Sequence, residues 1–439
     1  MWQRRGVRRV GSGGRVVGAR LYAHAVAGII GDETDAAAVV PQRETTRWIS
    51  TGWRATIGSA KGSRMTASEE GGAPKAGALL GGIFQAERDP AAPTPFGRIF
   101  KPNDEWLARS PGEPVIEPEL PIVDTHHHLW DLPGYRYLLP DLLADIRCGH
   151  NIVATVFNEC HSMYRAGGPE EMRPVGEVEF CAGVAAMSES GIYGPTRICA
   201  GIVGFADLTL GDRVAKVLEA QIAVGGGRFR GIRHAAGWHT DPVIGNSHTN
   251  PGPGLYLRPD FRAGMAQLVR LGLSLDTWLY HTQLADAVDL ARAFPSANIV
   301  MCHMGGPLGY GPYAGKTDEV FTAWKAGMKE LASCPNVSVK VAGVMMRLAV
   351  YDYLKEPAPA STTTLARHWA PWVSTCIELF GPDRCMAESN FPVDKMGVTY
   401  GGMWNALKRI TAGCSADEKN RIFSGTANRV YRLGLPLPG

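Results

Sequence analysis

Short apolar runs alternate with segments of helical spacing along the chain from residue 121 onward. Each run is rich in branched or other apolar side chains and is bounded by polar, glycine or proline residues, which is the pattern of a buried strand. We predict eight such strands, at residues 122–123, 152–156, 198–205, 229–232, 273–278, 299–302, 337–341 and 385–387.

Four of the intervening segments have apolar residues at helical spacing and end at glycine or before proline. They are residues 214–221, which follow Asp212 as a capping residue, and residues 261–269, 284–291 and 372–380. Repeated strand–helix units imply a parallel sheet with helical crossovers, and eight units fit a closed (β/α)8 TIM barrel. The alternative is an open doubly wound sheet, which would place a glycine-rich phosphate loop after its first strand. This chain has histidines there.

The start of the chain differs from the rest. Residues 1–31 contain six arginines and no Asp or Glu, which is typical of a mitochondrial transit peptide, although serine is scarce. The alternative is that Met65 begins the natural chain, and the protein is then expected in the cytoplasm. We divide the chain into a leader or non-native extension at 1–64, an irregular Gly-, Ala- and Pro-rich lead-in at 65–118, and a barrel at 119–439.

Composition limits the functional classes without choosing among them. The chain is 45% hydrophobic and 20% charged, as ordinary globular proteins are. Its net charge is only +3, so nothing indicates a nucleic-acid partner, and no apolar run is long enough to span a membrane. Nine cysteines without a Cys-x-x-Cys pair favour a reducing compartment. We expect a small-molecule substrate as the partner, and leave open whether the chain forms a homo-oligomer.

Three histidines, His126, His127 and His128, follow the first predicted strand. In a (β/α)8 barrel the active site forms at the carboxyl ends of the strands. Side chains alternate along a strand, so we expect His126 and His128 to face the interior and His127 to face the barrel wall. Two adjacent imidazoles can bind a metal ion or form a cationic clamp for a substrate. The apolar strand before them disfavours the alternative, a histidine-rich surface turn.

Polar residues end several other predicted strands. Glu159 follows the second strand, Arg233 and His234 the fourth, His281 the fifth and His303 the sixth. Arg233 suits a carboxylate or another oxyanion, although a structural ion pair is equally consistent with its position. One histidine of this kind would be an ordinary core residue, but histidines at four strand ends are hard to explain that way. We therefore predict an active site at this end of the barrel.

Three motifs give the chain a family resemblance. They are Val-Asp-Thr-His-His-His-Leu-Trp-Asp from residue 123, Cys-His-Met-Gly-Gly-Pro from residue 302 and Ser-Asn-Phe-Pro-Val-Asp from residue 389. In this order, at these strand ends, they resemble the amidohydrolase superfamily. Within it they are most similar to the amidohydrolase-related group, which contains sugar lactonases and the pyrone-dicarboxylate lactonase. The resemblance covers about residues 121 to 433 and implies a hydrolase.

The resemblance also implies roles for single residues. The paired histidines of the family correspond to His126 and His128, and its later strand-end histidines to His303 and His281. The eighth strand of the family ends Gly-Ser-Asp-Trp-Pro, where the Asp activates water or binds metal. In this chain Asn390 stands in place of that Asp, and Glu388 replaces the Gly. A neutral amide cannot act as a general base and is a poor ligand for a first-row metal.

We accordingly expect two groups of site residues. The catalytic group is His126, His128, His303, Glu388 and Asn390, and the substrate-binding group is Trp130, Glu159, Arg233, His234 and His281. One divalent metal such as zinc on His126, His128 and His303 is one reading, and a metal-free mechanism is the other. Glu388 shares a strand face with Asn390 and would accept the proton, unless it is a structural ion-pair partner of Arg233 or Lys340.

The working hypothesis is hydrolysis of a lactone, or of an amide, of a small organic acid. One alternative is non-oxidative decarboxylation of an aromatic acid, in which Arg233 would hold the carboxylate and a metal a neighbouring hydroxyl. Another is a barrel that binds a small molecule without turnover, because Asn390 replaces the acid. The three hypotheses predict different measurements. Hydrolysis releases a proton from a lactone, decarboxylation releases carbon dioxide, and a binding protein shows only a thermal shift.

Overall fold

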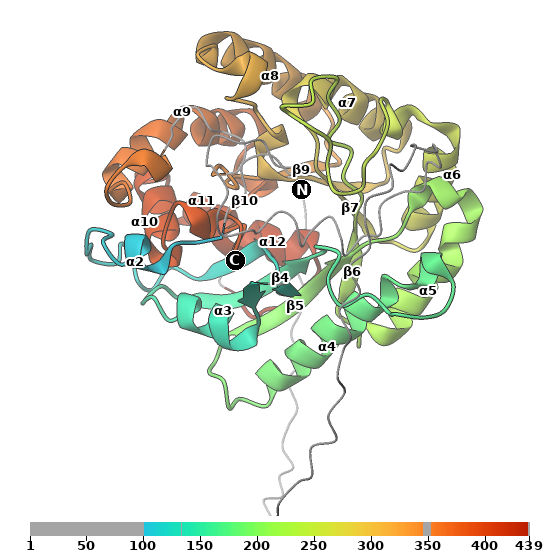
Figure 1. Cartoon of the computed structure of the whole chain (residues 1–439), viewed down its shortest axis with the longest axis horizontal. Coiled ribbons are helices and arrows are strands. Elements are labelled where there is room, and N and C mark those ends of the chain that lie inside the picture. The colour runs from blue at the N-terminus through green and yellow to red at the C-terminus, as the bar shows by residue number, and fades with distance from the viewer. Residues whose placement is uncertain (1–100, 133, 346–352, 438–439) are drawn as a thin grey trace, which may run out of the picture. The chain divides into compact units, whose positions relative to one another are not determined.

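Eight parallel strands form one sheet that curves into a barrel (Figure 1). The computed structural model describes residues 101–132, 134–345 and 353–437. The strands lie in chain order: β1 (Ile122–His127), β4 (Ile152–Asn158), β5 (Arg197–Gly204), β6 (Phe229–Arg233), β7 (Ser274–Thr277), β8 (Asn298–Met301), β9 (Val337–Lys340) and β10 (Cys385–Met386). The backbone N–H of His128 donates to the carbonyl of Phe391 at 2.7 Å and joins the segment after β10 to β1. The predicted (β/α)8 barrel is confirmed, and each predicted strand overlaps an observed one.

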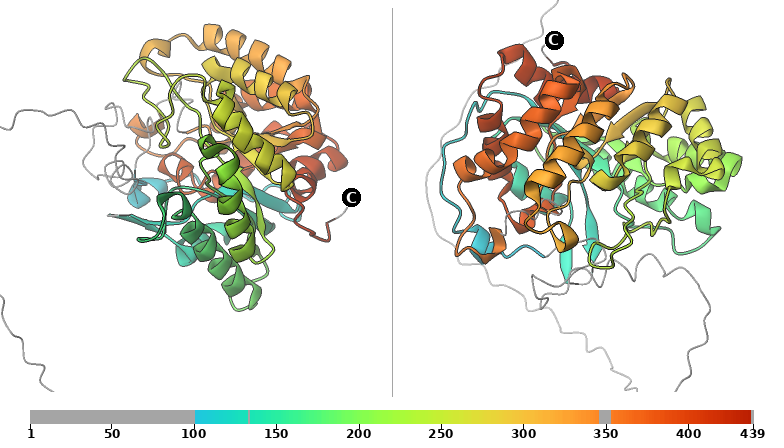
Figure 2. Two further views of the ribbon diagram at one scale, coloured as in Figure 1. Left: turned by 90° about the vertical axis from the view of Figure 1, so that its right-hand side faces the viewer. Right: turned by 90° about the horizontal axis from the view of Figure 1, so that it is seen from above.

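Helices cover the outside of the barrel (Figure 2). They include α3 (Leu139–Ile146), α4 (Val175–Glu189), α5 (Val214–Val224), α6 (Pro259–Arg270), α7 (Leu284–Ala293), α8 (Thr317–Ala332), α9 (Thr362–Phe380), α10 (Tyr400–Ile410), α11 (Ala416–Asn420) and α12 (Thr426–Val430). The four predicted helical segments lie within α5, α6, α7 and α9. Helix α9 begins well before the predicted residue 372, because Ser361 caps it and Pro371 is accommodated inside it.

Apolar side chains fill the end of the barrel where the strands begin. Residues from several strands pack there against the end of the chain, including Val123, Ala154, Val300, Met386, Tyr431 and Leu433. The segment from α12 onward therefore closes this end. The polar residues that follow the strands lie at the opposite end, which is where (β/α)8 barrels carry their active sites.

Three short elements near the start of the barrel were not predicted. The lead-in contains a one-turn helix, α2 (Asp104–Leu107), within its described part. The indole N–H of Trp106 donates to the carbonyl of Glu356 at 2.8 Å, and Glu113 accepts the N–H of Thr362 at 2.9 Å, so this segment is docked on the barrel. After β1 an antiparallel pair forms from β2 (Trp130–Leu132) and β3 (Tyr135–Tyr137). Strands of three residues are too short to show a sequence period.

The predicted leader at 1–64 lies outside the described residues. In the ranges that the structure describes, no helix combines the length and the hydropathy that a membrane span needs.

Candidate active site

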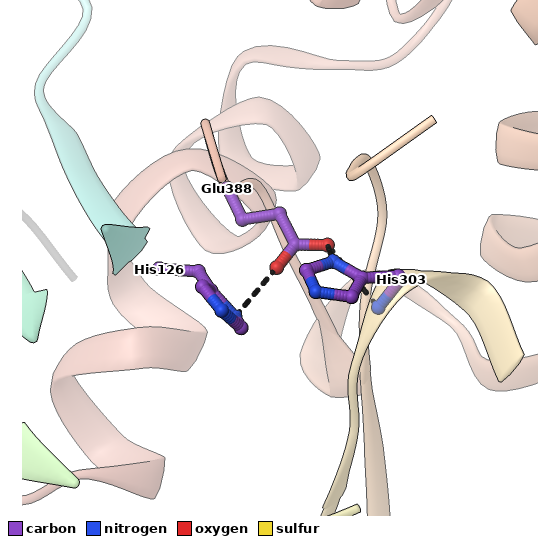
Figure 3. Close-up of side chains that lie close together, drawn as sticks. All are labelled: His126, His303 and Glu388. Atoms are coloured by element: carbon purple, nitrogen blue, oxygen red, sulfur yellow. Dashed lines mark hydrogen bonds and ion pairs between the residues drawn. The ribbon is translucent and has the colours of Figure 1, made fainter. Parts of the chain in front are cut away.

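Glu388 contacts two histidines at the carboxyl end of the barrel (Figure 3). His126 belongs to β1, His303 follows β8, and Glu388 follows β10. Glu388 Oε1 lies 2.9 Å from His303 Nδ1 and accepts the backbone N–H of His303 at 3.2 Å. Glu388 Oε2 lies 3.1 Å from His126 Nδ1. All three side chains are buried, so this carboxylate and these imidazoles interact away from bulk water.

The backbone around His303 explains how its ring reaches Glu388. His303 and Met304 adopt left-handed φ angles of 51° and 52°, and Gly305 and Gly306 continue the turn. A Cβ atom on Gly343 would lie 2.0 Å from His303 Nδ1. The imidazole can therefore occupy this position only because residue 343 is a glycine.

His126 and His128 lie on one side of β1, and His127 lies on the other. The rings of His126 and His128 have centroids 4.9 Å apart, and His128 stacks on Trp130 at 5.8 Å. His128 Nδ1 is 2.9 Å from the carbonyl oxygen of Asn158, so it donates and leaves Nε2 as the acceptor. His127 Nε2 lies 2.8 Å from Thr155 Oγ1 in the barrel wall.

Arg233 connects His126 to Glu159. Its Nη1 lies 3.1 Å from His126 Nε2, and its Nε donates to Glu159 Oε1 at 2.7 Å. Its Nη2 donates to the backbone carbonyl of Glu159. The guanidinium is therefore held by one residue and presents a cationic donor to the centre. Because Arg233 donates to His126 Nε2, the neutral His126 ring carries its proton on Nδ1, next to Glu388.

Lys340 lies deeper in the barrel, beneath His126. Its ammonium group lies 2.8 Å from Asp276 Oδ2, 3.2 Å from Asn158 Oδ1 and 3.4 Å from His126 Nδ1. Tyr431 donates to the same Asp276 oxygen at 2.7 Å. Among the described residues, the carboxylates that pair with Arg233 and Lys340 are Glu159 and Asp276. The alternative in which Glu388 is their ion-pair partner is wrong, because Glu388 faces the two histidines.

Asn390 pairs with Asp394. Its Nδ2 donates to Asp394 Oδ1 at 2.8 Å, and its backbone N–H donates to the carbonyl of His126 at 2.8 Å. Burial raises the pKa of Asp394 to about 8, although the N–H groups of Asn390 and Met345 oppose this by donating to the carboxylate. Asn390 stands where the family has its Asp, and the buried carboxyl of Asp394, four residues later in the chain, lies beside it.

Two predicted substrate-binding histidines contact residues outside this centre. His234 Nδ1 accepts the N–H of Leu208 at 3.3 Å, and its ring packs on Phe205 and Phe261. The ring of His281 packs against Tyr313 with centroids 5.1 Å apart. Both form part of the aromatic surroundings, so a direct substrate contact by either stays a prediction.

Burial sets the protonation of the central histidines. It lowers the pKa of His126 well below its usual value, and the charge of Lys340 lowers it further. Burial also lowers the pKa of His128, followed by the charge of Arg233. The pKa of His303 is lowered by burial despite the opposing effect of Glu388. The three imidazoles are therefore uncharged near neutral pH, which is the form that accepts protons or binds metal.

The donor set at this centre fits a divalent metal. His126, His303 and Glu388 each offer a ligand atom, and these atoms all lie within 4.8 Å of one another. Two imidazoles and one carboxylate form the protein ligands of many catalytic zinc sites. Glu388 Oε2 is buried and faces His126 Nδ1 at 3.1 Å, so a metal ion at this centre would displace the proton that lies between them. This group has Glu388 beside the two histidines, and a ligand role for His128 stays a prediction.

Comparison with known proteins identifies the family of this chain. The family model for amidohydrolases matches residues 123–433. An uncharacterized protein of Sinorhizobium fredii, y4mH, is 32% identical over 337 residues, which cover 72% of this chain and 99% of the relative. An L-fucono-1,5-lactonase of Burkholderia ambifaria is 24% identical over 334 residues, covering 72% of this chain and 96% of that protein.

A solved structure shares the fold. It is a zinc-bound amidohydrolase from Burkholderia multivorans with a TM-score of 0.55 and 24% sequence identity, covering 72% of this chain and 99% of that one. The matches span the barrel from its first strand to its last helix, and this chain belongs to the amidohydrolase family and is a hydrolase.

Proposed function

We propose that the chain hydrolyses a lactone of a small organic acid at the centre formed by His126, His303 and Glu388. The observation that carries the proposal is the buried contact of 2.9 Å between Glu388 Oε1 and His303 Nδ1. A carboxylate that orients an imidazole is a common way to build a general base. The similarity to proteins named as sugar-acid lactonases supports a cyclic ester as the substrate.

His303 is the proton acceptor in this proposal. Its Nδ1 donates to Glu388, so its Nε2 has the free lone pair and takes a proton from the attacking water. Glu388 then stabilises the imidazolium ion that forms. The water oxygen bonds to the lactone carbonyl carbon, and the ring C–O bond breaks as the imidazolium returns its proton to the leaving oxygen. The product is a hydroxy acid, which loses a proton to solvent at neutral pH.

Arg233 stabilises the negative charge that develops on the carbonyl oxygen. It is buried, it is fixed by Glu159, and one of its N–H groups already contacts His126 at 3.1 Å. A fixed cationic donor in a site shielded from water needs little reorganisation as charge develops. His128 packs edge-on against His126 and stacks on Trp130, and His128 and Trp130 are proposed to hold the body of the substrate.

A divalent metal held by the same residues is the alternative to this metal-free route. His126, His303 and Glu388 would hold it, and such an ion would lower the pKa of a bound water and polarise the carbonyl group.

The proposal is tested by screening lactones of sugar acids and of small aromatic acids with a pH indicator. Hydrolysis should release one proton per lactone, and Glu388→Gln should lose most of that rate. Glu113→Gln is the matched control, because Glu113 contacts Thr362 and Arg409 outside the site. Its turnover should match that of the unaltered chain. Release of carbon dioxide from aromatic acids, or binding of a lactone without turnover, would contradict the proposal.

A further inference from the structure

A second group of metal-ligand side chains lies next to Arg233, outside the centre described above. It consists of Glu159, His161 and His248, whose ligand atoms all lie within 4.8 Å of one another. His248 Nε2 is 3.0 Å from Glu159 Oε1 and 3.2 Å from Oε2. His161 Nε2 is 3.7 Å from Glu159 Oε2, and the two imidazole centroids are 4.4 Å apart. One carboxylate oxygen thus faces two imidazole nitrogens.

These separations match the edges of a tetrahedral zinc site. Zinc binds imidazole nitrogen and carboxylate oxygen at about 2.0–2.2 Å, so neighbouring ligand atoms of a tetrahedron lie about 3.4 Å apart. The distances from Glu159 Oε2 to the two imidazole nitrogens, 3.2 Å and 3.7 Å, lie on either side of that value. Small side-chain adjustments would therefore complete three corners of the coordination sphere.

One ring nitrogen of His161 has no hydrogen-bond partner among the described residues. Its Nε2 atom is buried and makes no hydrogen bond within the described residues, and its side chain is only 9% exposed. Leaving a buried polar atom unsatisfied costs about 1–3 kcal/mol, so such atoms usually have a ligand, an ion or a water beside them. This nitrogen points toward Glu159, which lies in the direction that a shared ion would occupy.

The backbone holds His161 in this position. Glu177 Oε1 accepts the N–H of Cys160 at 3.0 Å and the N–H of Ser162 at 2.9 Å, so the residues on both sides of His161 are tied to helix α4. His161 itself has a left-handed φ of 57°. The loop after β4 is therefore fixed in a conformation that a residue other than glycine adopts only when its surroundings require it.

We propose that Glu159, His161 and His248 bind a divalent transition-metal ion of the zinc type, at a site separate from His126, His303 and Glu388. Glu159 Oε2 would bind the ion while Oε1 keeps its contact with Arg233 at 2.7 Å. The ion would join the loop after β4 to His248, in the long segment between β6 and α6. Its fourth position is open to water or to an oxygen of the substrate.

The protonation states of Glu159 and His161 suit this role. Burial alone would raise the pKa of Glu159, but His248 and Arg233 overcome it and hold that pKa well below its usual range. Burial lowers the pKa of His161 to about 3. The carboxylate is thus ionised and His161 is neutral, which are the forms that bind metal.

The experiment measures Zn²⁺ and Co²⁺ binding to the full chain after removal of metal with a chelator. His161→Asn and His248→Asn are each made in a chain that also carries His303→Asn, so the other candidate site is disabled. The matched control is His239→Asn in the same background, because His239 lies in the same segment as His248 but contacts Tyr313 instead of Glu159. The control chain should bind one ion and melt at a higher temperature with Zn²⁺.

Loss of His161 or His248 should weaken binding by more than about tenfold and abolish the Zn²⁺-dependent rise in melting temperature, since each removes a direct ligand. The readout does not depend on turnover, and the shift on adding Zn²⁺ is interpretable even if a variant is less stable. Equal affinity and stoichiometry in all three chains, or no binding by the control chain, would overturn the proposal.

Discussion

His303 Nδ1 lies 2.9 Å from Glu388 Oε1, and the same oxygen accepts the backbone N–H of His303. An ionised carboxylate only accepts hydrogen bonds, so the two contacts place the His303 proton on Nδ1. They also fix the position of the ring, because both its backbone and its side chain are held by one carboxylate. Under the proposed function Glu388 acts through His303, whereas the sequence pattern alone suggested Glu388 as the direct base.

The rate should have an acid limb below the usual histidine range. The proposed base is His303, and burial lowers its pKa from the ordinary value of 6.5. The base loses its function only when it becomes protonated, so kcat/KM should stay constant from neutral pH down past 6.5 and fall at lower pH. A kcat/KM profile between about pH 4 and 9 checks this, and an acid limb centred above the ordinary value would contradict it.

The same shifts affect stability in a defined direction. Between the ordinary pKa of 6.5 and the lowered values of the folded state, His126, His128 and His303 bind protons in the unfolded chain but not in the folded one. The free energy of unfolding should therefore decrease as pH falls below about 6.5, and these histidines should contribute no such change above it. Denaturant titrations at several pH values measure the slope.

Asn390→Asp restores the family's residue but places a second carboxyl beside Asp394, whose Oδ1 is now 2.8 Å from the Asn390 amide. Two buried carboxyls at this distance cannot both ionise, so the pKa of one rises. A raised pKa gives a loss of stability that grows as pH increases, so the melting temperature should fall more at pH about 8 than at pH about 5.

The double variant Asn390→Asp/Asp394→Asn is the control for that prediction. It exchanges the two residues and keeps a single carboxyl in the pair, so most of the stability should return. A double variant as unstable as Asn390→Asp alone would show that the repulsion between carboxyls is not the cause.

Lys340→Met should destabilise the fold strongly. Lys340 and Asp276 form an ion pair in which both side chains are 0% exposed. Removing one partner of a buried pair leaves an uncompensated charge and costs about 3–5 kcal/mol. Arg292→Met, which breaks the exposed pair with Glu330, should cost less than about 1 kcal/mol. Denaturant unfolding compares the two variants, and equal losses would show that Asp276 is stabilised by other contacts.

His127→Ala should affect stability and spare turnover. His127 contacts Thr155 at 2.8 Å in the barrel wall, away from Glu388. Losing the hydrogen bond should cost about 1–3 kcal/mol of unfolding free energy. His126→Ala should instead reduce kcat at least about a hundredfold, because it removes the imidazole between Glu388 and Arg233. If His127→Ala lost turnover and His126→Ala kept it, the assignment of His126 to the centre would be wrong.

Much of the barrel and part of its centre could be predicted from the sequence. Apolar runs predict buried strands, and alternation along β1 separates His126 and His128 from His127, because side-chain direction is fixed within a strand. His303 and Glu388 could be grouped with His126 because parallel strands end at the same edge. The family resemblance then showed that Asn390 stands in place of the family's Asp.

The remaining features depend on packing that no local pattern records. Alternation does not extend beyond a strand, and His281 begins a 3-10 turn, so its ring points toward Tyr313. His248 lies in a long segment without a sequence period and reaches Glu159 only through the tertiary fold. Asp394 follows Pro392, where strand alternation no longer sets side-chain direction.

The most direct test of the proposed mechanism is a double-mutant cycle on Glu388 and His303. Each of Glu388→Gln and His303→Ala should lower kcat on a turned-over lactone by about a hundredfold to ten-thousandfold. If Glu388 acts through His303, the double variant should be no slower than the slower single variant, because residues that act as a unit are strongly non-additive. Losses that multiply in the double variant would show that the two residues act independently and would contradict the account.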